Sequence, residues 1–275
     1  MDKEKFVISA FANSINGDDG AVVDGYCYSK DLFCEDIHFK RTWMDLKQIG
    51  AKAMIVNISD AIVMNSIPKY ALLGLSLPKD LSLNDIKKIQ QGLLQEAKNF
   101  KIQIIGGDTI ADNKINISIT IISKVNKNQK VTYRKGLKKG DFLAFSGKLG
   151  DSIKGLRILQ RGSLLHSKHR FIRPSLRSNF FYDIAKKINA SMDLSDGLNK
   201  DLSRMLAINR LGIKFLRKLS FFELNSAEEY EILFAFNKKY KAYIENMAKK
   251  HRVKINIFAK TKLGRYMYYG KEHHF

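Results

Sequence analysis

Aspartates recur in this sequence in glycine turns and beside apolar runs, where the backbone could come close to a ligand. The acids concerned are Asp18, Asp19, Asp31, Asp60, Asp108, Asp193 and Asp196. Clustered carboxylates repel one another, so bringing them together is favourable when cations lie between them. Mg²⁺ suits such a set because it binds a few carboxylates and completes its octahedron with water and phosphate oxygens. Neighbouring glycines let phosphates approach backbone N–H groups. The acids therefore predict a site for Mg²⁺ and a nucleotide.

Each acid taken alone has a simpler explanation. Asp-Gly pairs are ordinary turn signals, and a helix cap would be enough to explain Asp196. Common nucleotide signatures are also missing, because SGKLGDS does not have the spacing of a P-loop and no G-x-G-x-x-G motif occurs. An ATP site in this chain must therefore belong to another fold.

The elements that position these acids alternate between strands and helices. In the first half of the sequence, the pattern of apolar residues predicts strands at 26–33, 70–77, 102–105 and 115–125, and helices at 46–64 and 83–100. After the polar, glycine-containing segment 135–140, the second half predicts strands at 142–145, 231–236 and 253–258, and helices at 152–160, 180–188 and 239–250. We expect an α+β (mixed α/β) fold of two domains, residues 1–134 and 135–275.

The composition is that of a globular protein, with 275 residues, 45% hydrophobic and 27% charged. No apolar run approaches the ~20 residues that cross a bilayer, and the two cysteines, Cys27 and Cys34, form no CxxC pair. We expect a cytoplasmic protein without a membrane partner. We expect no nucleic-acid partner, because the basic residues are scattered and lysine pairs fit solvated helix faces. The net charge of +21 keeps a basic RNA-binding protein as an alternative.

The order of the motifs makes the interpretation specific. They are GDDGAVV, DLFCEDIHF, IGAKAMIVNISDAIVM, IPKYALLGLSLP, GGDT, SGKLGDSIKGL, RPSLR, MDLSDGL, EEYEILF and a terminal HHF. From Gly17 to Phe275 the sequence resembles the thiamine-monophosphate kinases, of the superfamily that includes aminoimidazole ribonucleotide and selenophosphate synthetases. The resemblance implies direct transfer of the ATP γ-phosphoryl group to thiamine monophosphate, with several Mg²⁺ ions. It also implies an N-terminal mixed sheet that pairs into a homodimer, a C-terminal α/β sandwich and a cleft between the domains.

Site residues follow from the same resemblance, position by position. It implies catalytic roles for Asp31, Asp60 and Asp193, and metal ligands at Asp19, Ser29, Asp31, Asp60, Asp108, Asp193 and Asp196. It implies ATP contacts at Gly107, Asp108, Arg134 and Ser195, and substrate contacts at His38 and Glu228. Without the resemblance, Arg134 is equally well explained as a solvated charge in a linker, and His38 is equally well explained as a structural histidine.

Several positions depart from the family pattern. The family's Gly-Gly-Glu-Asp-Tyr stands here as Ser226–Tyr230, Lys30 replaces a threonine, and Glu272 replaces an aromatic residue for which Tyr268 or Tyr269 could substitute. A non-catalytic member of the family is therefore an alternative. Selenophosphate synthetase is disfavoured because no cysteine precedes the GDD turn, and the DLFCEDIHF and SDGL contexts disfavour aminoimidazole ribonucleotide synthetase.

Overall fold

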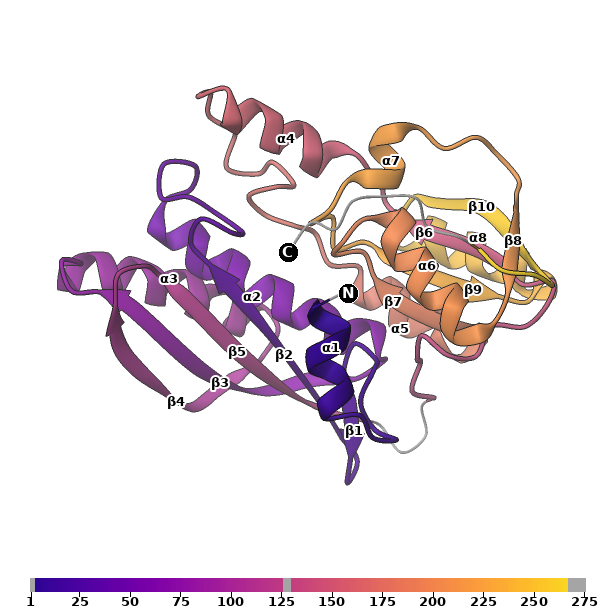
Figure 1. Cartoon of the computed structure of the whole chain (residues 1–275), viewed down its shortest axis with the longest axis horizontal. Helices are drawn as coiled ribbons and strands as arrows, with labels where there is room; N and C mark the ends of the chain where they lie inside the picture. Colours follow the sequence, from indigo (N-terminus) through magenta and orange to yellow (C-terminus); the bar gives the residue numbers. More distant parts are fainter. Residues whose placement is uncertain (1–2, 126–129, 267–275) are drawn as a thin grey trace.

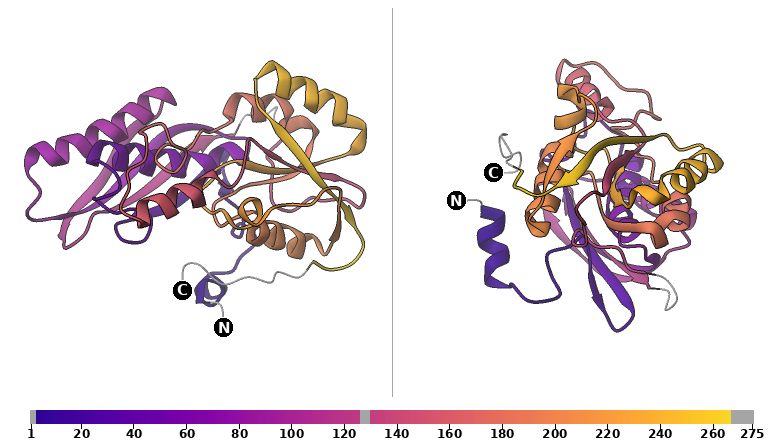
Figure 2. Two further views of the ribbon diagram at one scale, coloured as in Figure 1. Left: turned by 90° about the horizontal axis from the view of Figure 1, so that it is seen from above. Right: turned by 90° about the vertical axis from the view of Figure 1, so that its right-hand side faces the viewer.

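The computed structural model describes residues 3–125 and 130–266, which form two five-stranded sheets and the helices packed on them (Figure 1). In Figure 1 the first sheet and its two long helices occupy the left half, and the second sheet occupies the right half. A short N-terminal helix, α1 (Lys3–Ala10), stands apart from both sheets (Figure 2). The mixed α/β class predicted from the sequence is confirmed. The predicted boundary at 134/135 falls between the two sheets and stays a prediction.

The first sheet has the strand order β1-β2-β5-β3-β4. Its strands are β1 (Ala21–Val23), β2 (Tyr26–Cys34), β3 (Ile67–Pro78), β4 (Gln103–Asp112) and β5 (Asn116–Lys124). Only β3 and β4 run parallel, and the connection between them is helix α3 (Leu83–Asn99). Alternate residues of β5, from Ile117 to Ile121, are buried under the helices, so one face of the sheet forms a core.

Helix α2 (Leu46–Val63) lies between the two halves of the molecule and is buried along nearly its whole length. A capping box between Asp45 and Gln48 fixes its first turn. Gly50 of α2 and Gly92 of α3 face the backbone of the opposite helix, which a Cβ at either position would overlap. The two glycines therefore let the helices approach closely and hold α2 in one position against the sheet.

The second sheet is antiparallel, with the strand order β7-β9-β6-β10-β8. Its strands are β6 (Phe142–Ser146), β7 (Ile188–Asp193), β8 (Gly212–Phe215), β9 (Ile232–Phe236) and β10 (Ile255–Lys262). The helices of this half are α4 (Asp151–Gln160), α5 (Ser178–Ile184), α6 (Leu198–Asn209), α7 (Phe221–Asn225) and α8 (Lys241–Lys250), with short 3₁₀ turns η1 (Ala185–Lys187) and η2 (Lys238–Tyr240).

Helices cover both faces of this second sheet. Ala144 and Phe234 belong to a core that continues through α5 and α8 to α2, whereas Phe145 and Leu233 belong to a core formed with α6. Figure 2 shows α8 (yellow) and α6 (orange) on opposite sides of the strands. The predicted α/β sandwich is confirmed, and the first core joins the two halves of the chain.

Several predicted element bounds are wrong. The strand expected over 253–258 is β10, which begins at Ile255 and continues to Lys262. The strand expected to end at Ile105 continues as β4 through the glycines to Asp112. The β3–β4 register shifts so that Ile105 is skipped, and a Cβ at Gly107 would overlap the backbone of Leu73. The glycines thus accommodate a bulge and keep the strand paired. The helix expected over 180–188 ends at Ile184, because Ile188 already pairs with Phe236 in the second sheet.

Candidate active site

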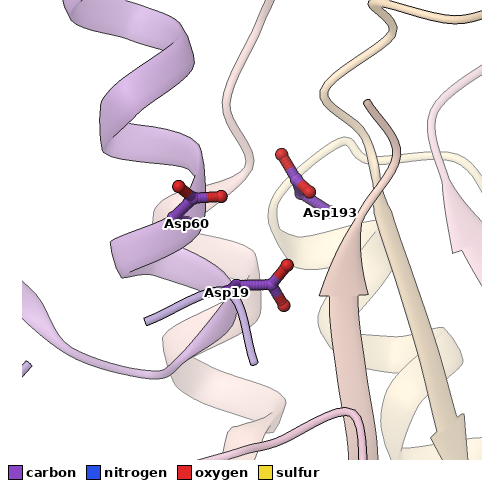
Figure 3. Close-up of side chains that lie close together, drawn as sticks. All are labelled: Asp19, Asp60 and Asp193. Carbon is purple, nitrogen blue, oxygen red and sulfur yellow. The ribbon is translucent and has the colours of Figure 1, made fainter. Parts of the chain in front are cut away.

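Three aspartates from distant parts of the sequence meet between the two sheets. Asp19 lies in the turn before β1, Asp60 near the end of α2, and Asp193 at the end of β7. One carboxylate oxygen from each lies within 4.8 Å of the others, and all three residues are at least 92% buried. Figure 3 shows the side chains pointing toward one another. The arrangement has the donor set of a site for a hard divalent cation.

Burial and the charges of neighbouring acids disfavour the ionised forms of Asp60 and Asp193. Desolvation and the charges of neighbouring acids raise the pKa of Asp60 and of Asp193 well above the ordinary value. Desolvation, Glu228 and Asp19 raise the pKa of nearby Asp31 to about 6. A bound cation would reverse this effect, because it favours the charged form of every carboxylate around it.

Asp31 is oriented by the helix behind it. Its backbone N–H donates to the Asn57 side-chain oxygen at 2.9 Å, and the Asn57 amide donates to the Ala53 carbonyl on α2. Two residues earlier on β2, Ser29 is buried and its hydroxyl has no hydrogen-bond partner in the part of the chain that the structure describes. The same holds for one oxygen of Asp19. Such orphaned buried oxygens are what a cation would satisfy.

Arg134 ties the segment between the sheets to the acidic turn. Its guanidinium lies 2.5 Å from the Asp19 carboxylate, and its backbone N–H donates to Asp18 at 3.0 Å. Desolvation and the charge of Asp19 raise the pKa of Asp18 to about 6. Arg134 is therefore a partly buried cation at the cluster and not a solvated linker charge.

These residues line a cavity of about 460 Å³ between the halves. The structure brings Asp19, Asp31, Asp60 and Asp193 to it from the predicted set. It also brings His38, Arg134, Ser195, Asp196 and Glu228. A larger cavity of about 680 Å³ lies beside α3, but the acid that lines it, Glu96, is paired with Arg173 at 2.6 Å. We place the site at the smaller cavity because the clustered carboxylates lie there.

Gly107 and Asp108 do not line this cavity. Both are exposed on β4, which the order β1-β2-β5-β3-β4 separates from β2 by two strands, or ~14 Å at the usual spacing. Their predicted roles in binding ATP and metal stay predictions.

Asp196 lies apart from the three-aspartate cluster and is paired with basic residues. Arg204 contacts its carboxylate at 2.5 Å and Lys200 at 3.3 Å, both from α6. Sequence reasoning missed these two cations. Their spacing of one helical turn, beginning four residues after Asp196, is the signal that could have identified them.

His38 and Glu228 also line the cavity. The Cys34 backbone N–H donates to His38 Nδ1 at 3.0 Å, and the His38 ring stacks on Phe33. The Glu228 carboxylate accepts a hydrogen bond from the Tyr230 hydroxyl and pairs with Lys52. Sequence reasoning did not select Lys52. The signal that could have identified it is a lysine inside an apolar helical run.

Two of the positions that depart from the family pattern make hydrogen bonds within the protein. Glu229 accepts hydrogen bonds from the backbone N–H groups of Gly150 and Ser152 and from the Ser226 hydroxyl, so it anchors the segment to the start of α4. Lys30 reaches across the sheet to Ser118. Glu272, Tyr268 and Tyr269 lie outside the described residues.

Comparison with known proteins identifies the family of this chain. Residues 17–125 match the family model "AIR synthase related protein, N-terminal domain". The chain is 33% identical over 213 residues to the thiamine-monophosphate kinase of Aquifex aeolicus, covering 74% of this chain and 67% of that protein. It is 32% identical over 234 residues to the Leptospira interrogans thiamine-monophosphate kinase, covering 77% and 75%. The solved structure of AaThiL complexed with AMPPCP and TMP superposes with a TM-score of 0.84 at 25% identity, covering 96% and 90% of the two chains. The chain therefore belongs to the thiamine-monophosphate kinase family.

Proposed function

We propose that this protein transfers the γ-phosphoryl group of ATP to the phosphate of thiamine monophosphate, giving thiamine diphosphate and ADP. An oxygen of the acceptor phosphate forms a bond to the γ-phosphorus, while the bond from that phosphorus to the oxygen bridging the β-phosphate breaks. The observation that carries the proposal is the convergence of Asp19, Asp60 and Asp193 on a cavity between the sheets. Support comes from the related kinases and from the AaThiL complex, which holds AMPPCP, an analogue of ATP, and TMP.

Several Mg²⁺ ions belong to the proposal, because the donor set fits them. Asp19, Asp60 and Asp193 would hold them, with Asp31 and Ser29 adjacent, and the orphaned oxygens of Asp19 and Ser29 would gain a partner. When bound, these ions neutralise the charge of two phosphate groups that would otherwise repel each other.

The remaining predicted residues divide between the two substrates. Arg134 and Ser195 are proposed to bind ATP, and Arg134 adds positive charge beside the acidic turn. His38 and Glu228, which line the same cavity, are proposed to contact the organic part of the acceptor. Further metal contacts at Asp196 and Asp108 complete the proposal, although Asp196 must then share its carboxylate with Arg204.

A homodimer is also proposed, on the evidence of the uncovered face of the first sheet. Tyr28, Ile122 and Tyr70 lie opposite one another in neighbouring strands, and Leu32 and Leu72 are 58% and 39% exposed. Exposed apolar side chains that lie together on one face of a sheet are typical of an interface. Leu72→Glu should shift the protein to a monomer in analytical ultracentrifugation, whereas Leu94→Glu on the exposed side of α3 should not.

The cytoplasm is the proposed location. No helix in the described part of the chain is both long and apolar enough to span a membrane. Fractionation of cells producing the tagged protein tests this location.

The decisive experiment is product analysis. The protein, ATP, Mg²⁺ and thiamine monophosphate should give thiamine diphosphate and ADP in equal amounts, and omission of thiamine monophosphate should leave ATP intact. Binding of ATP without any product would favour a non-catalytic family member. Salt-sensitive retention of RNA on filters without phosphoryl transfer would favour the nucleic-acid alternative.

A further inference from the structure

Lys52 is a charged residue in the core of the protein. Its side chain is fully buried on α2, and its ammonium lies 4.2 Å from the centre of the Phe171 ring and 5.6 Å from that of Phe33. Burial of an ammonium is unfavourable by several kcal/mol unless an anion compensates it. The compensating anion is Glu228, whose carboxylate oxygen lies 3.0 Å from the ammonium nitrogen. An apolar residue would fill the same space without this penalty, so the charge itself has a role.

Lys52 and Tyr230 together orient the Glu228 carboxylate. Oε2 faces the ammonium, and Oε1 accepts a hydrogen bond from the Tyr230 hydroxyl at 2.8 Å. The Glu228 side chain stays 20% exposed and lines the cavity, so it can still accept hydrogen bonds there. Burial alone would raise the pKa of Glu228, but Lys52 and His38 outweigh it and hold this pKa below its ordinary value.

Helix α2 places this pair at a defined distance from the acidic cluster. Lys52, Val56 and Asp60 recur every fourth residue and so share one face of the helix. Val56 and Asp60 both line the cavity. Eight residues of helix separate Lys52 from Asp60, or ~12 Å along the axis. An acceptor whose phosphate lies at the Asp60 end therefore presents its organic part to Glu228.

We propose that Lys52 is a positioning residue for acceptor recognition, because it fixes the Glu228 carboxylate to accept a hydrogen bond from an amino group on the acceptor's organic end. The inference rests on the proposed function, since the aminopyrimidine ring of thiamine monophosphate carries such a group. Lys52 does not touch the acceptor and acts only through Glu228.

The test compares two acceptors, thiamine monophosphate and oxythiamine monophosphate, in which an oxygen replaces the exocyclic amino group. The wild type should prefer the amino compound in kcat/KM. Lys52→Met should raise the KM for thiamine monophosphate by about tenfold and reduce the preference by a similar factor, while the KM for ATP stays within about twofold. Calorimetry should show the same loss in the binding of thiamine monophosphate without ATP. Lys47→Met, at an exposed position of the same helix, is the matched control and should change neither value.

Other outcomes would overturn the inference. An unchanged preference in Lys52→Met, or an equal loss for both acceptors, would show that Lys52 only supports the fold. Tyr230→Phe removes the second donor without leaving a buried charge, so it should lower the same preference even if Lys52→Met does not fold. An unchanged preference in Tyr230→Phe would also count against the inference. A wild-type protein that makes no thiamine diphosphate would instead refute the proposed function.

Discussion

Replacing Asp60 by asparagine should change stability in opposite directions with and without Mg²⁺. In the metal-free protein the substitution removes one of three carboxylates whose oxygens lie within 4.8 Å of one another, so repulsion falls. In the presence of Mg²⁺ the same substitution removes a ligand. We therefore expect Asp60→Asn to be more stable than the wild type in a chelator and less stable in Mg²⁺, and to lose most turnover while remaining folded.

The geometry sets the size of the effect. Two full charges 4.8 Å apart repel by about 3.5 kcal/mol at an effective dielectric constant of 20. Burial and the neighbouring acids raise the pKa of Asp60, so the repulsion of two full charges is an upper limit. A gain of about 1 to 2 kcal/mol remains, which raises the Tm of a chain of this size by about 2 to 8 °C. Mg²⁺ at 100 times its Kd would stabilise the wild type by about 2.7 kcal/mol and so reverse the order.

Thermal unfolding in EDTA and across a Mg²⁺ titration measures both effects. Asp80→Asn, at an exposed turn, is the control and should follow the wild type in every condition. A lower Tm for Asp60→Asn in EDTA, together with a wild-type response to Mg²⁺, would refute the reasoning. It would show that the three carboxylates neither repel one another nor bind a cation together.

Three further results are expected. Desolvation and neighbouring acids raise the pKa of Asp31 to about 6, so protonation of Asp31 stabilises the folded state at low pH. The Tm of the metal-free protein should therefore fall as the pH rises through 6. A Tm that rises over this range would contradict the expectation. Gly147→Ala should lower the free energy of unfolding by about 3 kcal/mol, and Gly162→Ala by about 1 kcal/mol. Both glycines have positive φ, but only a Cβ at Gly147 would overlap the Glu231 carboxylate. Equal losses for the two variants in urea unfolding would exclude the overlap. Arg134→Gln leaves the buried Asp19 carboxylate without its cation and should destabilise the metal-free protein by about 3 kcal/mol. Mg²⁺ should restore part of this loss. If Mg²⁺ restores none of it, Arg134 is not part of the cation site.

Local patterns sufficed for the elements whose pairing and burial are regular. The periodicity of 46–64 and 83–100 predicted α2 and α3 within one residue of their ends, because each helix buries a face against the other or against a sheet. The strand β7 was missed, although it carries Asp193. Its sequence INASMD is short and mixed, and it becomes a strand because its backbone pairs with β9. That pairing joins residues 39 to 48 positions apart, which no local pattern reports.

The acids show the same limit at the level of the site. Resemblance indicated which aspartates to select, but the convergence of Asp19, Asp60 and Asp193 depends on α2, which packs on the first sheet and against β7 and α5 of the second half. Asp108 has the same kind of local sequence, yet it lies on an edge strand because the adjacent glycines accommodate a bulge instead of ending the strand.

Lys52 makes the complementary point. Hydropathy treats a lysine in an apolar helix as an interruption, whereas its position on the Asp60 face of α2 makes it the partner of Glu228, 176 residues later in the chain. The charge of a core residue is informative when its counterion lies in a cavity, since the favourable pairing then depends on a group that a ligand also contacts. Under the proposed assignment, α2 carries both Asp60, where the phosphates would bind, and Lys52, which orients Glu228. The proposal therefore links the spacing along α2 to the length of acceptor that fits.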